Sequence, residues 1–365
     1  MDKKRFWKRG FAVVSVLKVA CVSILGILGT AFIAGSAFAV VRFDQLLDKL
    51  NYETELVNPA PPVFSEADRM EIQPDAKIDL TNLSVRGDTE NIHNYFLLGV
   101  DSRGSGDRGR SDTMMILSVN DSAKTIKLIS LLRDTWATIP GMDWDGDGYD
   151  DYAKLNAAYA SGGFDLLNKT VRQNFRLDID KYVAVDFSGF AAAVDALGGV
   201  NVEVDGDAVT WIPKEDPGDP DRFACDEYGN QLREPIGYTA GKYTLNGYQA
   251  LAFCRVRKCY PSSDFVRQQN QRDVVSALIS KAKSSSPAKL YSMAENVLPA
   301  VTTNMTRNEI EGYIVNVLKY AGYTIETEYH LPAAGEFENL NLGAAGLWIK
   351  DPETTVRALH EYIYG

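Results

Sequence analysis

The longest apolar run of the chain extends from Val19 to Val41 and contains no charged residue. About twenty such residues cross the hydrocarbon core of a bilayer. Basic residues precede the run and favour the cytoplasmic side, so a single-pass cell-membrane protein is expected, with everything after Arg42 outside. A cleaved signal peptide is the alternative, because Ala37-Phe38-Ala39 resembles a cleavage site, although the run is long for one. Both interpretations export the rest of the chain.

Three shorter apolar runs, each bounded by Gly, Asp, Asn or Ser, predict β-strands. They are Tyr95–Val100, Thr113–Val119 and Thr125–Leu132. Asp101 ends the first run and Asp112 starts the second, whereas Arg133 and Asp134 follow the third. If the strands are neighbours in an up-down-up order, these four polar residues collect at one edge of the sheet.

The remaining pattern alternates between helix and strand, which predicts an α/β fold. Helices are expected over 154–175, 187–197 and 264–283, and strands over 200–204 and 250–256. Glycines at 162 and 163 interrupt the first helix. Residues 210–240 are rich in Pro, Gly and Asp and predict an irregular excursion.

Charge is unevenly distributed. The first 42 residues carry seven basic residues and Asp2, which is +6 of a total of −11, so the rest of the chain holds −17. A body this acidic does not bind nucleic acid through a general basic surface. Any anionic ligand must therefore be captured by a local group of arginines.

The two aspartates beside the first two predicted strands have arginines near them in sequence, among them Arg110. Mg²⁺ binds one or two carboxylates and completes its shell with water and phosphate, and arginine neutralises the remaining phosphate charge. Asp101 and Asp112 therefore suggest a magnesium–phosphate site, with ordinary salt bridges in an exposed loop as the alternative. Arg133 is expected at the sheet edge, and an ion pair with Asp134 is disfavoured because adjacent strand residues point to opposite faces.

A second group of candidate residues lies later in the chain. On a strand, Arg255 and Arg257 point to the same face. Asp264 opens the next helix, on which Arg267 and Gln271 lie one turn apart. A helix N-terminus adds positive potential, so these side chains can surround one phosphate group. A salt-bridge network with Asp264 is the alternative.

Two other features are candidate sites. The acidic run 143–151 matches the start of a calcium-binding EF-hand loop, but Lys154 stands where the loop requires Glu, so a solvated acidic loop is favoured. Cys225 and Cys259 lie in loop-like sequence and are expected to form a disulfide, which leaves Cys254 unpaired. Three histidines and no Cys-x-x-Cys give no support to a zinc site or a Cys–His nucleophile.

In order along the chain, six segments resemble the LytR–CpsA–Psr family of cell-wall glycopolymer transferases. They are LLGVDSR, GRSDTMM, RDT, KLNAAYASGG, VDALGGV, and FCRVR followed by DFVRQQNQR. Any one segment is a weak match, but the ordered set after a membrane anchor is specific. The resemblance implies an α-β-α layered domain with a central mixed sheet, one N-terminal transmembrane helix, and an apolar groove for a polyprenyl tail.

The resemblance also implies roles for individual residues. Asp101 and Asp112 would hold Mg²⁺, with Mn²⁺ as the alternative metal. Arg110 and Arg133 would contact the pyrophosphate as catalytic residues, with Arg133 favoured. The remaining head-group residues would be Arg255, Arg257, Arg267 and Gln271, with Asp264 as supporting carboxylate. Asn270 stands where the family often has arginine, which puts the phosphate affinity in doubt.

The implied reaction transfers a glycopolymer from a polyprenyl-pyrophosphate carrier to peptidoglycan as a phosphodiester, beside the membrane lipid. Asp134 or Asp264 would accept the proton of the attacking hydroxyl. The expected organisation is a cytoplasmic tail (1–18), an anchor (19–41), an extracellular linker (42–90) and a catalytic domain (91–365). Two other functions stay open, a polyprenyl-pyrophosphate hydrolase and a non-enzymatic polyprenyl-phosphate-binding envelope protein. The sequence identifies neither the polymer nor the acceptor sugar.

Overall fold

The structure is a computed structural model, and it describes most of the chain after residue 44. The described residues are 45–53, 79–101, 110–144, 146–219, 222–260, 263–285, 287–310, 320, 322–341 and 345–365. The expected anchor, 19–41, lies outside them. Within these ranges, no helix is both long enough and apolar enough to cross a membrane.

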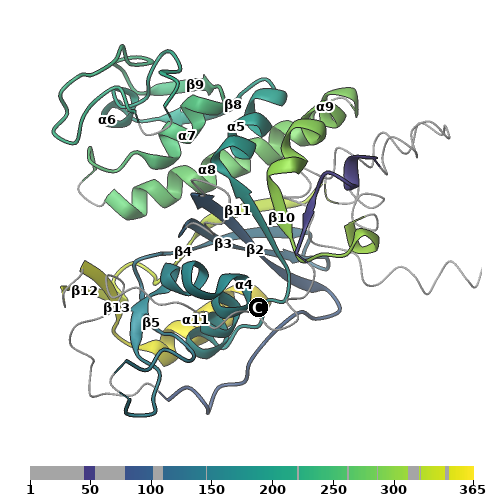
Figure 1. The fold of residues 1–365 in the computed structure, drawn as a ribbon, viewed down its shortest axis with the longest axis vertical. Coiled ribbons are helices and arrows are strands. Elements are labelled where there is room, and N and C mark those ends of the chain that lie inside the picture. The colour runs from purple at the N-terminus through teal and green to yellow at the C-terminus, as the bar shows by residue number, and fades with distance from the viewer. Residues whose placement is uncertain are drawn as a thin grey trace, which may run out of the picture. The chain divides into compact units, whose positions relative to one another are not determined.

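A seven-stranded mixed sheet has the strand order β1-β10-β7-β2-β3-β4-β11 (Figure 1). Its strands in chain order are β1 (Asn51–Tyr52), β2 (Ile92–Asp101), β3 (Arg110–Asn120), β4 (Thr125–Leu131), β7 (Tyr182–Asp186), β10 (Val301–Thr303) and β11 (Thr324–Leu331). β1 pairs in parallel with β10, whereas β2, β3 and β4 are antiparallel. The expected α/β class with a central mixed sheet is confirmed, and the α-β-α layering stays a prediction.

The chain forms two compact units, which are described separately. The sheet unit comprises Glu53–Ala184 and Glu328–Gly365, and the helical unit comprises Met1–Tyr52 and Val185–Thr327.

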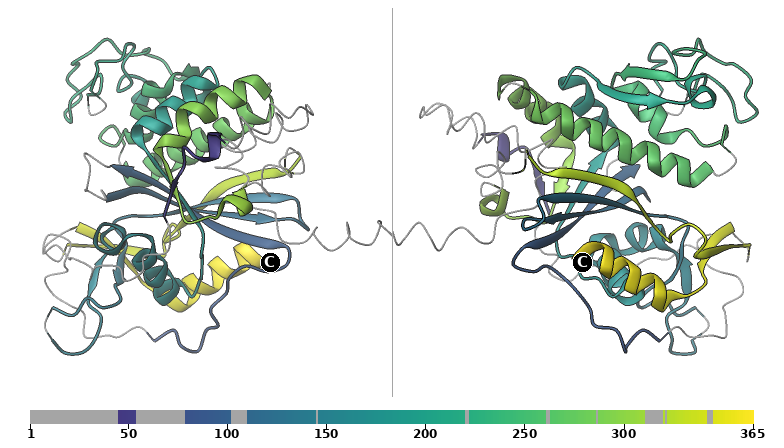
Figure 2. Two further views of the ribbon diagram at one scale, coloured as in Figure 1. Left: turned by 45° about the vertical axis from the view of Figure 1, so that its right-hand side comes forward. Right: turned by 180° about the vertical axis from the view of Figure 1, so that it is seen from behind.

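In the sheet unit, the three predicted strands form an antiparallel meander, which confirms their up-down-up order. Two short hairpins and two helices complete this unit. They are β5 (Trp136–Thr138) with β6 (Tyr152–Lys154), β12 (Phe337–Asn341) with β13 (Ala345–Ile349), α4 (Leu155–Phe175) and α11 (Pro352–Tyr364). Figure 2 shows α4 and α11 beside these strands. Alternate residues of the meander, such as Phe96, Ile116 and Ile129, are buried in one core with Leu167 of α4 and Leu359 of α11.

The predicted glycine interruption of α4 is real. Gly163 has φ 69° and ψ −156°, which is not helical and lies in a region of backbone space that favours glycine. The helix continues on both sides, so the glycine bends it without ending it.

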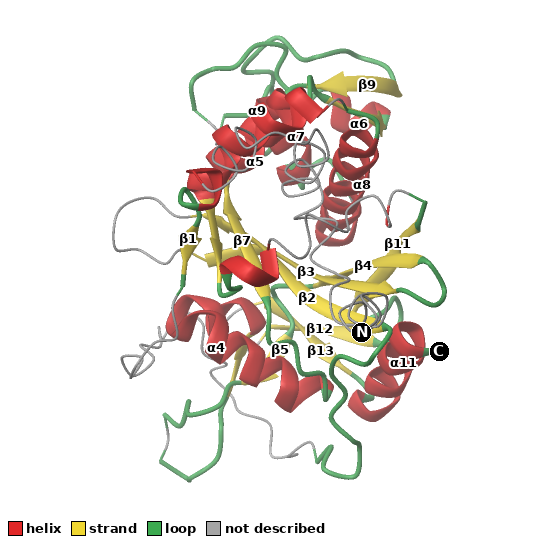
Figure 3. Cartoon of the chain, turned by 90° about the vertical axis from the view of Figure 1, so that its right-hand side faces the viewer, coloured by secondary structure: helices red, strands yellow, loops and turns green. Residues whose placement is uncertain are grey.

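Besides strands β1 and β10 of the large sheet, the helical unit contains a helix cluster and a two-stranded hairpin (Figure 3). Its elements are α5 (Phe187–Ala196), β8 (Val200–Val204), α6 (Gly206–Val209), β9 (Gly241–Leu245), α7 (Gly247–Arg255), α8 (Ser263–Lys283), α9 (Pro287–Val297) and the 3-10 turn η2 (Leu298–Ala300). The expected helices over 187–197 and 264–283 and the strand over 200–204 are confirmed. Between α6 and β9 the described residues contain only isolated bridges, which confirms the irregular excursion.

The expected strand over 250–256 is wrong, because these residues belong to helix α7 and its C-cap, Val256. Asn246 accepts a hydrogen bond from the backbone N–H of Gln249, whose side chain accepts one from the N–H of Asn246. This capping box starts a helix. Ala250, Leu251 and Phe253 are all buried, and a short helix that is apolar all round cannot be distinguished from a buried strand by periodicity.

Candidate active site

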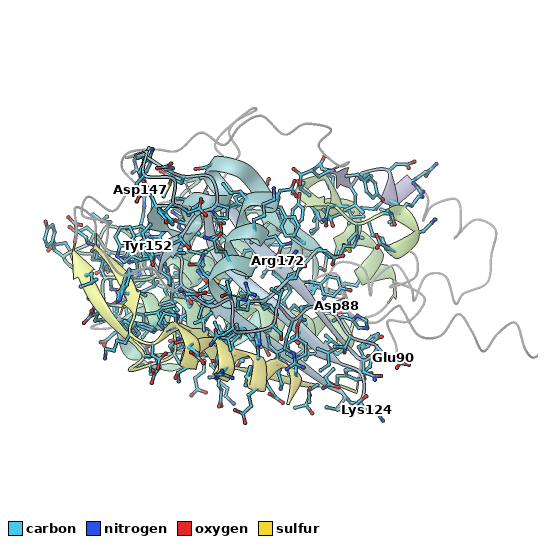
Figure 4. The ribbon with its side chains drawn as sticks, turned by 90° about the horizontal axis from the view of Figure 1, so that it is seen from below. Asp88, Glu90, Lys124, Asp147, Tyr152 and Arg172 are labelled. Carbon is cyan, nitrogen blue, oxygen red and sulfur yellow. The ribbon has the colours of Figure 1, made fainter. Side chains whose placement is uncertain are left out.

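Polar residues meet at one end of the β2-β3-β4 meander. The register pairs Asp101 of β2 with Arg110 of β3, and a bulge separates Gly99 from Val100. The backbones of Asp101 and Arg110 therefore lie at the expected edge, although their side chains lie outside the described part. Figure 4 shows the molecule from below and labels Lys124, in the turn between β3 and β4 at the opposite end of the meander.

Asp112 and Arg133 are joined directly at this edge. Nη1 of Arg133 donates a hydrogen bond to Oδ1 of Asp112, and the two side chains are 20% and 31% exposed, respectively. Charge-assisted hydrogen bonds of this kind are stronger than neutral ones, and partial burial reduces their screening. The sequence prediction that strand ends bring these two residues together is confirmed.

Arg133 also forms the ion pair with Asp134 that strand geometry disfavoured. β4 ends at Leu131, and Arg133 and Asp134 lie in a turn, so the alternation of a strand no longer applies. The Nε–Oδ2 distance is 3.5 Å. The other carboxylate oxygen, Oδ1, lies 3.1 Å from Nζ of Lys154. Asp134 therefore connects two cations.

Asp112, Arg133, Asp134 and Lys154 are hereafter called the charge network. Backbone hydrogen bonds fix the turn that carries it. The N–H of Leu347 donates to Asp134 O (2.9 Å), and the N–H of Leu155 donates to Thr135 O (2.8 Å). The sequence did not indicate Lys154 as a site residue, because its partner, Asp134, is twenty positions away. Its place as the N-cap of α4 brings it to the edge.

The charge network fits part of a magnesium site. Asp112 accepts the hydrogen bond from Arg133 through Oδ1. Carboxylate oxygens are hard ligands of the kind that Mg²⁺ binds. Among the described residues, no group of three or more His, Cys, Asp or Glu could hold a metal by itself. That is compatible with Mg²⁺, which commonly takes only one or two carboxylates and shares its shell with water and substrate phosphate.

The other predicted residues belong to the helical unit. Arg255 is the last residue of α7, and its guanidinium lies over the ring of Phe187, 4.7 Å from the ring centroid. Arg257 follows after the helix has ended at Val256. The expected arrangement of both arginines on one strand face is therefore wrong, because the backbone changes direction between them.

Helix α8 presents Arg267 and Gln271 on one face, four residues apart as expected. Both are buried, with 6% and 7% of their surface exposed. Nε2 of Gln271 donates to Cys254 O at 3.2 Å, which places Gln271 beside the end of α7 that carries Arg255. Asp264 lies on α8, but its side chain is outside the described part. Asn270 is buried and donates to Phe253 O at 3.4 Å, so it contributes to helix packing.

Of the two other features, the acidic loop agrees with expectation and the disulfide does not. In the acidic loop, Asp143 accepts hydrogen bonds from the N–H groups of Gly146 (2.8 Å) and Gly148 (3.1 Å), which fits the solvated loop that was favoured. The expected disulfide between Cys225 and Cys259 is wrong, since both thiols are free. Sγ of Cys225 donates to Thr210 O at 3.0 Å.

The chain is similar to a known family and to several proteins of that family. A family model described as the LytR_cpsA_psr family matches residues 63–346. The chain is 32% identical over 251 residues to the polyisoprenyl-teichoic acid–peptidoglycan teichoic acid transferase TagV of Bacillus subtilis. This match covers 68% of the chain but 58% of TagV, less than two thirds of its length. A TagU of Bacillus anthracis with the same transferase description is 30% identical over 327 residues, covering 89% of each protein.

Solved structures show the same fold. Protein gbs0355 from Streptococcus agalactiae has a TM-score of 0.59 and 25% identity, covering 75% of this chain and 88% of that one. TagV of B. subtilis has a TM-score of 0.55 and 27% identity, covering 75% and 98%. TagT bound to LIIa-WTA has a TM-score of 0.55 and 25% identity, covering 82% and 97%.

Proposed function

Since this chain belongs to the LytR–CpsA–Psr family, we propose that it transfers a glycopolymer from a polyprenyl-pyrophosphate carrier to peptidoglycan, releasing polyprenyl phosphate. The relatives TagV and TagU are named as teichoic acid transferases that use peptidoglycan, which supports this reaction class. The observation that carries the proposal is the charge network, in which a partly buried arginine is held between two carboxylates.

The proposed reaction is a phosphoryl transfer. A sugar hydroxyl of peptidoglycan attacks the phosphorus that bears the polymer, and a new P–O bond forms. The bond from that phosphorus to the bridging oxygen breaks, and polyprenyl phosphate leaves with the electron pair. Arg133 neutralises the charge that develops on the oxygens, and positioned cations of this kind provide much of the rate enhancement in phosphoryl transfer. The hydroxyl proton passes to a carboxylate base.

Asp101 and Asp112 would hold Mg²⁺, or Mn²⁺ in its place. Such an ion would act as a Lewis acid on the phosphate oxygens. The role of the chain is then to keep the Asp112 carboxylate oriented, which the hydrogen bond from Arg133 supports. Arg110 would bind the same phosphates from the strand that carries Asp112.

The residues of the helical unit would bind the lipid-linked head group. Arg267 and Gln271 are buried on α8 beside the end of α7, where Arg255 is half-buried, and cations and amides of this type suit phosphate oxygens. Arg257 and Asp264 complete the proposed set. The substrate is membrane-bound, so the proposal includes the anchor at 19–41 with the catalytic domain (91–365) outside the cell membrane.

The test uses the full chain in detergent with a synthetic polyprenyl-pyrophosphate glycan, peptidoglycan oligomers and Mg²⁺, followed by mass spectrometry. We expect glycan attached to peptidoglycan, lost with EDTA. Arg133→Ala should lower kcat by about a hundredfold or more, as removal of a transition-state donor does. Arg172→Ala is the matched control, because this arginine of α4 is 56% exposed and pairs with Asp178 at 3.1 Å. It should leave turnover unchanged.

Two other outcomes would replace the proposal. Free phosphorylated glycan as the sole product, with peptidoglycan unmodified, would make the chain a hydrolase. Tight binding of the lipid without turnover, at any metal tested, would make it a binding protein of the envelope.

A further inference from the structure

The described residues of the excursion, 213–219 and 222–240, belong to the helical unit. The excursion leaves α6 and returns to β9, and Figures 1 and 3 show it as a long loop beside these elements. An isolated bridge pairs Pro213 with Pro235. Nε2 of Gln249, in α7, donates to Pro213 O at 3.2 Å and to Lys214 O at 3.1 Å. Ordered loops of this length are uncommon and usually have a function.

The tip of the excursion is a turn fixed by one carboxylate. Oδ1 of Asp226 accepts hydrogen bonds from the N–H groups of Tyr228 (2.9 Å) and Asn230 (2.8 Å), and Oδ2 accepts one from the Asn230 amide (2.8 Å). An isolated bridge between Cys225 and Gln231 closes the turn. The backbone that carries Tyr228 is therefore held by Asp226, while the Tyr228 side chain hydrogen-bonds to Glu227.

This turn displays apolar groups to water. Tyr228 is 82% exposed, Tyr238 is 68% exposed and Leu232 is 60% exposed, and these are three of the four most exposed large hydrophobic residues that the structure describes. Nε2 of Gln231 donates to Oη of Tyr238 at 3.4 Å, which connects the two limbs of the loop. Together these four residues are called the tyrosine patch. Several large apolar side chains exposed on one short loop indicate a binding site.

Charge limits what the tyrosine patch can bind. Residues 213–240 contain seven acidic and three basic side chains. Two of the three basic groups are paired, Lys214 with Glu234 at 2.8 Å and Arg222 with Asp219 at 3.2 Å. A polyanion would be repelled, because like charges facing each other cost affinity. An uncharged partner with flat apolar faces and hydroxyl groups suits exposed tyrosines and an amide.

We propose that the tyrosine patch docks the uncharged glycan backbone of the acceptor polymer, outside the residues that perform the transfer. Sugar rings would stack on Tyr228 and Tyr238, and Gln231 would hydrogen-bond their hydroxyl or acetamido groups. The choice of peptidoglycan as acceptor rests on the proposed function. Glycan binding itself does not, because it needs no donor substrate and no metal.

The test measures binding of a β-1,4-linked N-acetylglucosamine hexamer, an uncharged mimic of the glycan backbone, to the full chain by calorimetry. We expect binding that is insensitive to salt and about tenfold weaker in the Y228A/Y238A double variant, since each aromatic contact is worth about 0.5–1.5 kcal/mol. Tyr228→Trp should retain binding. Tyr149→Ala is the matched control, because Tyr149 is 58% exposed but lies in the acidic loop of the sheet unit, and it should bind as the unmodified chain does.

Other outcomes would overturn the proposal. Equal affinity in the double variant would remove the patch from glycan binding. Binding that weakens steeply with salt, or a preference for a polyglycerol-phosphate chain, would show recognition of a polyanion instead. In the transfer reaction, the double variant should raise KM for the acceptor and leave kcat unchanged. If the double variant lost kcat but bound the glycan as before, this inference would fail and the proposed reaction would still stand.

Discussion

Asp134→Asn tests whether Asp134 positions the charge network or acts as the general base. The substitution keeps the shape of the side chain and removes its charge. In the structure Asp134 approaches Nε of Arg133 at 3.5 Å and Nζ of Lys154 at 3.1 Å, and these side chains are about one-fifth exposed. A base must be free to accept a proton, whereas both oxygens of Asp134 already face cations.

The magnitude follows from these contacts. A charge-assisted hydrogen bond to a buried group contributes about 1.5–3 kcal/mol, and an exposed ion pair contributes about 0.2–1 kcal/mol. The partly exposed pairs of Asp134 lie between these limits, so the variant should lose about 1–2 kcal/mol of unfolding free energy. Misplacement of Arg133 should lower kcat about tenfold to a hundredfold, as loss of a supporting partner typically does.

The assay is the transfer reaction followed across pH, with thermal unfolding of the same samples. If Asp134 is a positioning residue, Asp134→Asn should lower kcat and leave the shape of the pH–rate profile unchanged. Lys154→Met should have a smaller effect in the same direction, and the double variant should be less than additive because both changes act on Arg133. Asp147→Asn in the acidic loop is the control. Disappearance of the acidic limb of the profile in Asp134→Asn, with a loss of a thousandfold or more, would refute positioning and identify the general base.

Three further predictions concern the fold. Gly247→Ala should lower the unfolding free energy by about 1–3 kcal/mol in chemical denaturation, because a Cβ there would overlap Ala191 O; Gly322→Ala, with open space around the site, is the control, and equal stability of the two variants would contradict the packing. Burial raises the pKa of Asp273, so the folded state binds more protons than the unfolded one and stability falls as pH rises above about 4. Asp273→Asn should therefore raise the melting temperature at neutral pH and lose that gain in acid, whereas an equal gain at every pH would exclude titration as its cause. Burial lowers the pKa of His360, so stability should fall as pH drops below about 6.5. In thermal unfolding, His360→Gln should reduce the loss of stability with falling pH. An unchanged slope of stability against pH would show that other groups cause this loss.

The part of the fold that the sequence predicts well is the β2-β3-β4 meander. Its strands are short apolar runs with polar residues at both ends, and consecutive strands of this kind usually pair. Their order alone placed Asp112 beside Arg133, which the structure confirms. Lys154 could not be found in this way. It joins the network through the turn after β4 and the start of α4, and turns of this type have no periodic pattern.

Helix α7 shows where pattern analysis fails. Its residues are apolar on every side because the helix is buried, so no periodicity in the sequence distinguishes a helix from a buried strand here. The informative residues were Asn246 and Gln249, which form the capping box just before the apolar run. The error changed the geometry of the site, because it placed Arg255 and Arg257 on one strand face when a helix end separates them.

Helix α8 carries Arg267 and Gln271, whose role in the site stays a prediction, and its burial pattern is unusual. In its first half Arg267, Gln268, Asn270, Gln271 and Arg272 are all at most 7% exposed, whereas its second half buries apolar residues such as Val274 and Ile279. Burial of charged and amide groups opposes folding unless each group is hydrogen-bonded, and ordinary amphipathic helices avoid it. The buried face of α8 is therefore polar at one end and apolar at the other, and its apolar end stabilises the helical unit. Under the proposed function, its polar end would bind the charged phosphate head group.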